Sequence, residues 1–213
     1  YNKLLNLSKQ QLDTGVVAAS AGNHAQGLAL AAKKMGIAAT IVMPRTTPRI
    51  KVDAVRSKGA EVVLVGDSYD EAAAYATELV KKQGLTYIPP FDDPDVIAGQ
   101  GTIGMEILNQ HPDHLDAIFI AVGGGGLCAG IAAYVKQLRP EIKIIAVESD
   151  DAACLDAAIK AGERVTLDQV GIFADGTAVA QIGEVTFGLL KDLVDEVITV
   201  STDEICAAIK DVY

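Results

Sequence analysis

The sequence predicts an α/β protein made of two domains, each with three layers built around a parallel sheet. Apolar runs of strand length alternate with longer segments in which apolar residues have helical spacing. Glycine or proline stands between most of these segments, as at short strand–helix turns. Half of the 213 residues are hydrophobic, which is enough for a substantial core. This alternation is typical of parallel sheets that helices cover on both faces.

Residues 1–95 are expected to form the smaller domain. Its strands are expected at 16–19, 39–43, 61–65 and 86–88. The end of a helix is expected at 1–7, and further helices at 25–35, 48–58 and 69–83. Ser68 and Glu71 have the spacing of a capping box, which marks the start of the last of these helices. Gly36, Gly59 and Gly84 follow the predicted helix ends.

Residues 96–213 are expected to form the larger domain. An acidic, proline-bearing loop at 91–95 is the predicted crossing between the two domains. Strands are expected at 117–122, 142–147 and 196–200. Helices are expected at 97–109, 127–135, 152–161, 184–193 and from 202 onward. The stretch 165–183 has no clear periodicity and is expected to be irregular.

Four consecutive glycines, Gly123 to Gly126, stand between an apolar strand and a buried helix. Without Cβ atoms the backbone can bring its N–H groups close to an oxyanion. The dipole of the following helix favours negative charge at the same point. The sequence therefore predicts an anion site here, and phosphate is the expected occupant.

Two simpler interpretations of this stretch compete with an anion site. No residue from Ala117 to Val135 is charged, so the stretch is long enough to cross a bilayer. The glycines in its middle argue against a membrane helix, because each costs about 1 kcal/mol relative to alanine. A tight strand-to-helix turn is the other alternative. It would need only one or two glycines, so four favour a ligand that approaches the backbone.

Charge and cysteine content exclude several classes of function. The net charge is −10 and there is no basic cluster, which argues against binding to nucleic acid or to an anionic membrane surface. The three cysteines have no metal-ligand or disulfide spacing, which indicates a reducing cytoplasm. The N-terminus lacks both a signal-peptide pattern and an initiator methionine, so the chain is expected to be a fragment.

Ligands of parallel α/β sheets bind at the carboxyl ends of the strands. By that rule the turn from Ser20 to His24, the glycine run, Glu148 and the loop 174–177 are expected to converge. Simpler roles remain open for two residues of the turn. His24 beside a helix start is more often a hydrogen-bonded structural group, and Asn23 could serve only as an N-cap.

Two motifs about 100 residues apart carry a resemblance to a known family. The first is Ser-Ala-Gly-Asn-His-Ala-Gln-Gly at 20–27, and the second is Val-Gly-Gly-Gly-Gly-Leu at 122–127. With this pair the chain resembles the threonine dehydratases, which belong to the tryptophan synthase β-like, fold-type II group of pyridoxal phosphate enzymes. The resemblance covers essentially the whole chain. The stretch 170–176 is more similar to the biosynthetic branch, which serves isoleucine biosynthesis, than to the catabolic one.

The resemblance implies roles for individual residues. The cofactor phosphate would be held by the backbone N–H groups of Gly123, Gly124, Gly125, Gly126 and Leu127. Asn23 would hydrogen-bond the ring oxygen of pyridoxal phosphate, and Gly176 would line the ring. The substrate carboxylate would be bound by Ser20, Ala21, Gly22 and His24. The implied reaction is α,β-elimination, which converts L-threonine, and more slowly L-serine, to a 2-oxoacid and ammonia. A cytoplasmic homo-oligomer, either dimer or tetramer, is also expected.

Two departures from the family pattern bear on the chemistry. The Schiff-base lysine of the family is expected upstream of Tyr1, so no catalytic residue is assigned within the chain, which alone is expected to be inert. Some related enzymes bind a divalent cation at the places of Glu148, Ala152 and Cys154. A hard cation prefers oxygen ligands to a thiol, so no metal is assigned here.

Two alternatives to a threonine dehydratase remain. The first is another enzyme of the same group, such as a serine dehydratase or racemase. The second is a nucleotide-binding module. The spacing from Gly124 through Gly126 to Ala129 fits the alanine variant of the dinucleotide fingerprint, with Glu148 as the ribose ligand.

Overall fold

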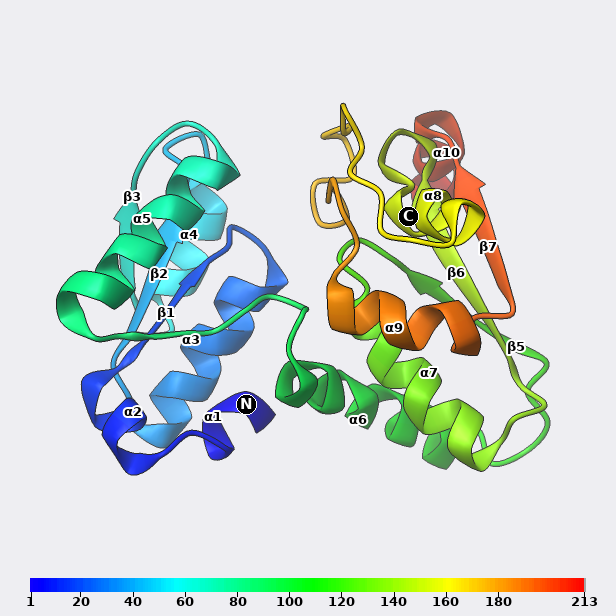
Figure 1. Ribbon diagram of the computed structural model, residues 1–213, viewed down its shortest axis with the longest axis horizontal. Coiled ribbons are helices and arrows are strands. Elements are labelled where there is room, and N and C mark those ends of the chain that lie inside the picture. The colour runs from blue at the N-terminus through cyan, green and yellow to red at the C-terminus, as the bar shows by residue number, and fades with distance from the viewer. Residues whose placement is uncertain (213) are drawn as a thin grey trace. The chain divides into compact units, whose positions relative to one another are not determined.

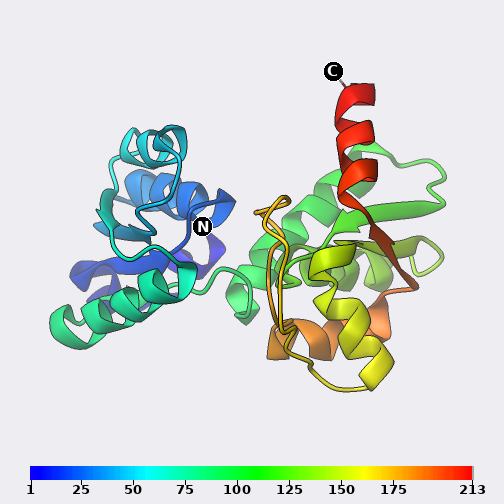
Figure 2. The same ribbon diagram turned by 90° about the horizontal axis from the view of Figure 1, so that it is seen from above.

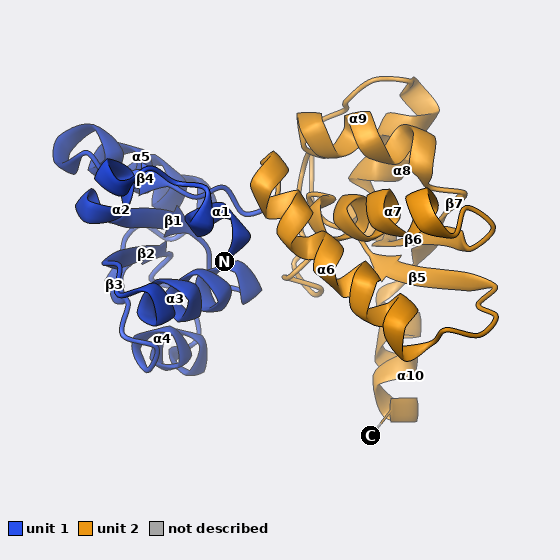
Figure 3. Cartoon of the chain, turned by 90° about the horizontal axis from the view of Figure 1, so that it is seen from below, with its two compact units in different colours: residues 1–90 blue, residues 91–213 orange. Residues whose placement is uncertain are grey.

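The structure is a computed structural model that describes residues 1–212 (Figure 1). The chain divides into two compact units, Tyr1–Pro90 and Phe91–Tyr213 (Figure 3). Both units are α/β with parallel sheets, so the predicted fold class is confirmed. The division follows Pro90, whereas the domain boundary expected from the sequence follows residue 95 and stays a prediction.

The first unit contains a four-stranded parallel sheet in the order β3–β2–β1–β4. Its strands are β1 Val16–Ala19, β2 Ala39–Met43, β3 Glu61–Leu64 and β4 Thr86–Tyr87. Its helices are α1 Asn2–Leu5, α2 Lys9–Thr14, α3 Asn23–Met35, α4 Arg49–Arg56 and α5 Tyr69–Gln83. Helices α3 and α4 lie on one face of the sheet and α5 on the other (Figure 2). Every residue of β1 is buried, because β1 has strands on both sides and helices on both faces.

Most elements predicted for this unit are confirmed. Ser68 and Glu71 form the predicted capping box at the start of α5, and Gly84 ends that helix in the left-handed conformation. Helix α4 ends at Arg56, two residues before its predicted end, and Gly59 lies beyond it at φ +87°. The short helix α2 was not expected from the sequence. It starts from a second capping box, in which the Ser8 hydroxyl accepts from the Gln11 N–H and the Gln11 side chain accepts from the Ser8 N–H.

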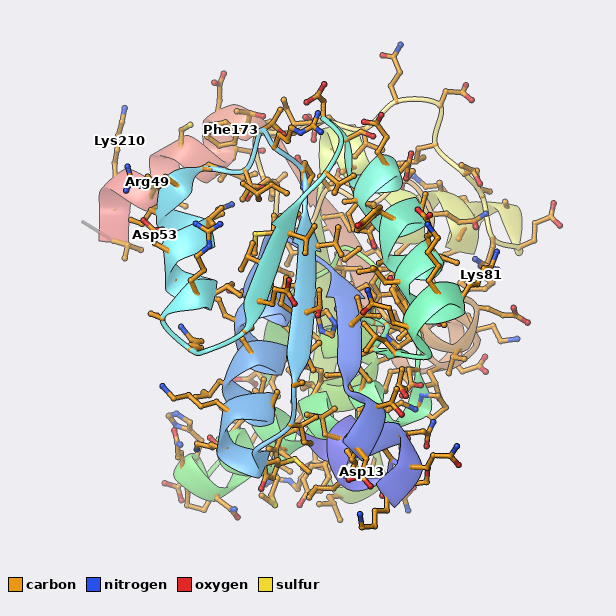
Figure 4. All side chains as sticks on the ribbon, turned by 90° about the vertical axis from the view of Figure 1, so that its left-hand side faces the viewer. Asp13, Arg49, Asp53, Lys81, Phe173 and Lys210 are labelled. Atoms are coloured by element: carbon orange, nitrogen blue, oxygen red, sulfur yellow. The ribbon has the colours of Figure 1, made fainter. Side chains whose placement is uncertain are left out.

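Most charged side chains of α4 and α5 face solvent. Arg49 and Asp53 form an ion pair across one turn of α4, with 3.4 Å between nitrogen and oxygen (Figure 4). Lys81 is exposed on α5 and points away from the sheet in the same view. These exposed charges belong to the solvated outer faces of amphipathic helices.

The second unit contains a three-stranded parallel sheet in the order β5–β6–β7. Its strands are β5 Ala117–Ala121, β6 Lys143–Ser149 and β7 Glu196–Val200. Its α-helices are α6 Pro94–Gln110, α7 Gly126–Leu138, α8 Cys154–Ala161, α9 Glu184–Leu193 and α10 Thr202–Val212, with a 3-10 turn at Asp150–Ala152. Helices α6, α7 and α9 pack together. The expected covering of both sheet faces is incomplete, because Phe119 of β5 is 64% exposed.

The predicted strands and helices of this unit are confirmed, with shifts at their ends. Helix α6 starts at Pro94, before the predicted residue 97, because the Asp93 carboxylate caps it and accepts from the N–H groups of Asp95 and Val96. Strand β6 continues through Ser149, so Glu148 lies inside the strand. No helix among residues 1–212 is long and apolar enough to cross a membrane.

Helices α6 and α7 approach each other at glycine. A Cβ atom added to Gly130 of α7 would overlap the carbonyl oxygen of Ile97 and lie 2.7 Å from the backbone nitrogen of Gly101, both in α6. A Cβ added to Gly101 would in turn lie 3.1 Å from the carbonyl oxygen of Gly130. The two helix backbones are therefore in direct contact, and no side chain can enter between them.

This contact predicts opposite effects for two helical glycines. We expect Gly130→Ala to lower the free energy of unfolding by about 1 to 3 kcal/mol, because the new methyl group forces the helices apart. We expect Gly188→Ala in α9 to raise it by about 0.5 to 1 kcal/mol. Nothing lies within 4 Å of a Cβ at Gly188, and alanine favours the helix. Urea unfolding of the full-length protein measures both values. Equal effects of the two variants would contradict the close approach of α6 and α7.

Candidate functional site

The backbone of the glycine loop, Gly123 to Gly126, is packed tightly against neighbouring residues. A Cβ at Gly124 would overlap the ring of Phe91, and a Cβ at Gly126 would lie 2.9 Å from the Cβ of Phe91. A Cβ at Gly123 would lie 2.9 Å from the Cα of Thr177. Gly125 is the N-cap of α7 and has φ +90°, which only glycine adopts without strain. Each of the four glycines is therefore required by this fold.

The N–H groups of the loop have no acceptor among residues 1–212. Among the hydrogen bonds of the described residues, none has as donor the backbone N–H of any residue from Gly123 to Cys128. The first N–H of this segment that is paired belongs to Ala129, which donates to the carbonyl of Gly125 at 2.8 Å. Gly124, Gly125 and Gly126 are buried, and buried N–H groups in proteins nearly always have a partner. Six successive unpaired donors at a helix N-terminus fit a phosphate group.

Gly176 belongs to a turn that lies against this loop. The N–H of Thr177 donates to the carbonyl of Ala174 at 2.9 Å, which closes the turn. The backbone of Thr177 is the group that leaves no room for a Cβ at Gly123. Gly176 itself is exposed, and nothing lies within 4 Å of its Cβ position. The structure thus brings Gly176 next to the glycine loop, as the strand-end rule predicts for this pair.

The Ser20–His24 turn forms a second helix N-terminus with unpaired donors, in the first unit. The Ser20 hydroxyl accepts from the Gly22 N–H at 3.2 Å, and this bond orders the turn. The N–H groups of Ala21, Asn23 and His24 donate no hydrogen bond within the described chain. Together with the start of the α3 dipole, they form a site for a small anion such as a carboxylate.

Asn23 is the first residue of α3, and Gly22 is the N-cap. The alternative in which Asn23 serves only as the N-cap is therefore wrong. Its side chain is exposed and makes no hydrogen bond among the described residues. The Asn23 amide is thus available to a ligand, whereas an N-cap side chain would be occupied by its own helix.

The imidazole of His24 is used by the fold. Its Nε2 lies 3.0 Å from the carbonyl oxygen of Ile88, just after β4, so the ring donates its N–H to that carbonyl. Burial lowers the pKa of His24, which keeps the ring neutral near pH 7. This contact is the structural role that the sequence left open for His24. The predicted contribution of His24 to substrate binding can still come from its backbone N–H.

Glu148 does not join the candidate site. It is 1% exposed, and its two oxygens each accept at 2.8 Å from the N–H groups of Leu155 and Asp156 at the start of α8. Burial raises the pKa of Glu148, while these hydrogen bonds oppose the shift. The carboxylate is therefore a cap for α8. Because the carboxylate is buried and both of its oxygens are occupied, the alternative in which Glu148 is a ribose ligand is wrong.

Neither the cysteines nor an apolar cavity of the second unit adds chemistry to the site. Burial raises the pKa values of Cys128 and Cys154 to about 12, so both remain unreactive thiols. Residues 1–212 contain no group of three or more His, Cys, Asp or Glu side chains arranged to hold a metal ion. An apolar cavity of about 800 Å³ lies among α6, α7 and α9, but no charged side chain lines it.

Two residues around the glycine loop could not be found from the sequence. Phe91 lies in the loop that the sequence marks only as a domain crossing, and Thr186 lies in the first turn of a predicted helix. Thr186 is fully buried and donates its hydroxyl proton to the carbonyl of Gly124 at 2.8 Å. Its partner is 62 positions away in the sequence, so no local pattern indicates the contact.

Known proteins resemble the chain over its whole length. Over 213 residues the chain is 58% identical to a biosynthetic, chloroplastic threonine dehydratase of Arabidopsis thaliana and 54% identical to the biosynthetic L-threonine dehydratase of Escherichia coli. These alignments cover 100% of the chain but only 36% and 41% of the two relatives. The chain thus spans less than half the length of these curated relatives.

Two solved structures have the same fold. The processed form of threonine deaminase isoform 2 from Solanum lycopersicum matches with a TM-score of 0.96 and 56% identity, over 100% of this chain and 62% of that chain. Maize serine racemase matches with a TM-score of 0.95 and 36% identity, over 100% of this chain and 64% of that chain. The profile of a family described as pyridoxal-phosphate dependent enzymes matches residues 1–213. The family indicated by the two sequence motifs is therefore confirmed, and the chain belongs to the pyridoxal-phosphate dependent enzymes.

Proposed function

We propose that this chain carries the cofactor and substrate loops of a threonine dehydratase that converts L-threonine to 2-oxobutanoate and ammonia in isoleucine biosynthesis. The observation that carries the proposal is the row of unpaired N–H groups from Gly123 to Cys128, a cradle for the phosphate of pyridoxal phosphate. High identity to biosynthetic threonine dehydratases supports the choice of substrate. We also propose that the protein is a cytoplasmic homo-oligomer, either a dimer or a tetramer.

Each loop has a role in this proposal. The N–H groups of Gly123 to Gly126 and of Leu127 hold the phosphate without any charged side chain. When bound, pyridoxal phosphate supplies the electron-withdrawing ring that makes the α-proton of an amino acid acidic. Asn23 donates its amide N–H to the ring oxygen, and Gly176 leaves space beside the ring. The substrate carboxylate is held at the start of α3, by the Ser20–Gly22 turn and by backbone N–H groups that include that of His24.

The activity is tested on the full-length protein, because this chain spans less than half the length of the curated relatives that it matches. We expect 2-oxobutanoate formation from L-threonine with a higher kcat/KM than pyruvate formation from L-serine. Activity should disappear when the cofactor is removed by dialysis and return when pyridoxal phosphate is added back. A preference for L-serine would contradict the threonine assignment. Accumulation of D-serine from L-serine would point instead to a racemase.

Asn23→Ala tests the proposed contact with the ring oxygen. We expect the dissociation constant for pyridoxal phosphate to rise about fivefold, the effect of one lost hydrogen bond. The melting temperature of the cofactor-free protein should stay unchanged or rise slightly. The Asn23 side chain makes no hydrogen bond in the fold, and alanine is the better helix former. Absorbance titration and thermal unfolding measure the two quantities. Asn109→Ala, on an exposed position of α6, is the matched control. A lower melting temperature with unchanged affinity would contradict the assignment.

His24→Gln tests whether the imidazole ring of His24 serves only the fold, while its backbone N–H serves the substrate. Glutamine can donate a similar N–H to Ile88 but does not titrate, so we expect the activity to be largely kept. Because the pKa of His24 is lowered on folding, the neutral ring contributes stability that is complete above about pH 6.5 and is lost as the pH falls towards the folded pKa. The melting temperature of the variant should therefore fall less than that of the wild type between about pH 8 and about pH 5.5. His111→Gln, at an exposed position, should leave this pH dependence unchanged. Abolished turnover in a stable His24→Gln protein would show that the ring itself acts in the reaction.

A further inference from the structure

The carbonyl groups of the glycine loop are paired, although its N–H groups are not. The carbonyl of Gly124 accepts from the hydroxyl of Thr186 at 2.8 Å and from the N–H of Gly183 at 3.4 Å. The carbonyl of Gly123 accepts from the thiol of Cys154 at 3.5 Å, a weaker donor. Thr186 and Cys154 are both fully buried. The carbonyls of Gly123 and Gly124 are therefore held by buried donors, whereas the N–H groups of the same loop have no acceptor among the described residues.

This pairing fixes the direction of the free N–H groups. A peptide unit is planar and trans, so its C=O and the N–H of the next residue point in opposite directions. The described chain has no cis peptide bond. Holding the carbonyl of Gly124 on Thr186 therefore aims the N–H of Gly125 away from Thr186. In the same way, holding the carbonyl of Gly123 on Cys154 aims the N–H of Gly124 away from Cys154.

Thr186 is itself held firmly. It lies in the first turn of α9, where the carboxylate of Asp92 accepts from the N–H groups of Glu184 at 2.9 Å, Val185 at 2.8 Å and Thr186 at 3.3 Å. Asp92 follows Phe91, whose ring lies against Gly124. The two-residue segment 91–92 thus contacts the glycine loop and also fixes the helix that supplies the Thr186 hydroxyl.

We propose that the hydroxyl of Thr186, assisted by the thiol of Cys154, is a positioning group that sets the glycine loop in its phosphate-binding conformation. This inference rests on the proposed function, because it assigns the phosphate of pyridoxal phosphate to the free donors. Four successive glycines have more backbone freedom than any other tetrapeptide, and ordering them on binding would cost affinity. Fixing their carbonyls in advance removes most of that cost. Neither Thr186 nor Cys154 is assigned a contact with the ligand.

The test compares pyridoxal 5′-phosphate with pyridoxal, which lacks the phosphate, in the full-length protein. The readout is the ratio of their two dissociation constants, measured by absorbance titration. We expect Thr186→Val, which keeps the shape but loses the hydroxyl, to weaken pyridoxal phosphate binding about fivefold and to leave pyridoxal binding unchanged. Thr186→Ser restores the hydroxyl and should restore the ratio. A purely structural role would weaken both ligands in proportion and leave the ratio as in the wild type.

Matched controls separate the possible outcomes. Thr77→Val removes an exposed hydroxyl that donates to the carbonyl of Ala73 at 3.0 Å in α5, and it should not change the ratio. If Thr186→Val does not fold, the same ratio of dissociation constants is measured for Cys154→Ala. A smaller preference for pyridoxal phosphate over pyridoxal supports the inference, and an unchanged preference overturns it. A wild-type protein that does not prefer pyridoxal phosphate over pyridoxal would refute the phosphate cradle itself. A wild-type preference that Thr186→Val leaves intact would refute only the role of Thr186.

Discussion

The contact of Phe91 with Gly124 and Gly126 is the constraint on which the second unit depends. The ring and backbone of Phe91 occupy the space that side chains at these two positions would need. The loop can therefore pack against Phe91 only as glycine. Asp92, the next residue, caps α9, so the same segment fixes both the loop and the helix behind it.

Both units use a helix N-terminus in the same way. In each, a parallel strand ends, the chain turns through small residues, and a helix begins with N–H groups that have no acceptor among residues 1–212. The two sites differ in how many donors they offer. The loop before α7 presents six successive N–H groups, which suits a phosphate, and the turn before α3 presents fewer, which suits a carboxylate. In the first unit the Ser20 hydroxyl orders the turn, and in the second unit the buried Thr186 hydroxyl and the packing of Phe91 hold the loop.

Local signals in the sequence were enough to predict most elements. Ser68 with Glu71, and Gly36 and Gly84, mark helix ends through hydrogen bonds and backbone angles that depend only on neighbouring residues. The short helix α2 was missed because six mostly polar residues have no hydrophobic periodicity, and only its capping box indicates it. Asn23 was open to misinterpretation for a similar reason, because an asparagine near a helix start fits the N-cap and the first helical position equally well in sequence.

The candidate site could be predicted only in part. The unpaired donors follow from the glycines themselves, since a strand, a glycine run and a helix impose that geometry. The contacts that support the loop were not predictable. Thr186 contacts Gly124 across 62 positions of sequence, and helix α6 and strand β5 lie between Phe91 and the loop. The burial of Glu148 is likewise not predictable, because a carboxylate near a strand end is expected to face a ligand. Its burial beneath the start of α8 depends on tertiary packing.

The cradle formed by Gly123 to Cys128 consists of backbone amides, and the sequence around it has no charged side chain from Ala117 to Val135. Backbone amides neither gain nor lose a proton in the range in which enzymes work, unlike the lysine, arginine or histidine of many phosphate sites. The affinity of this cradle for an anion is consequently set by the direction of the fixed amide dipoles. The cradle's own amides therefore do not titrate, whereas a phosphate bound there changes its charge when its second proton leaves near pH 6.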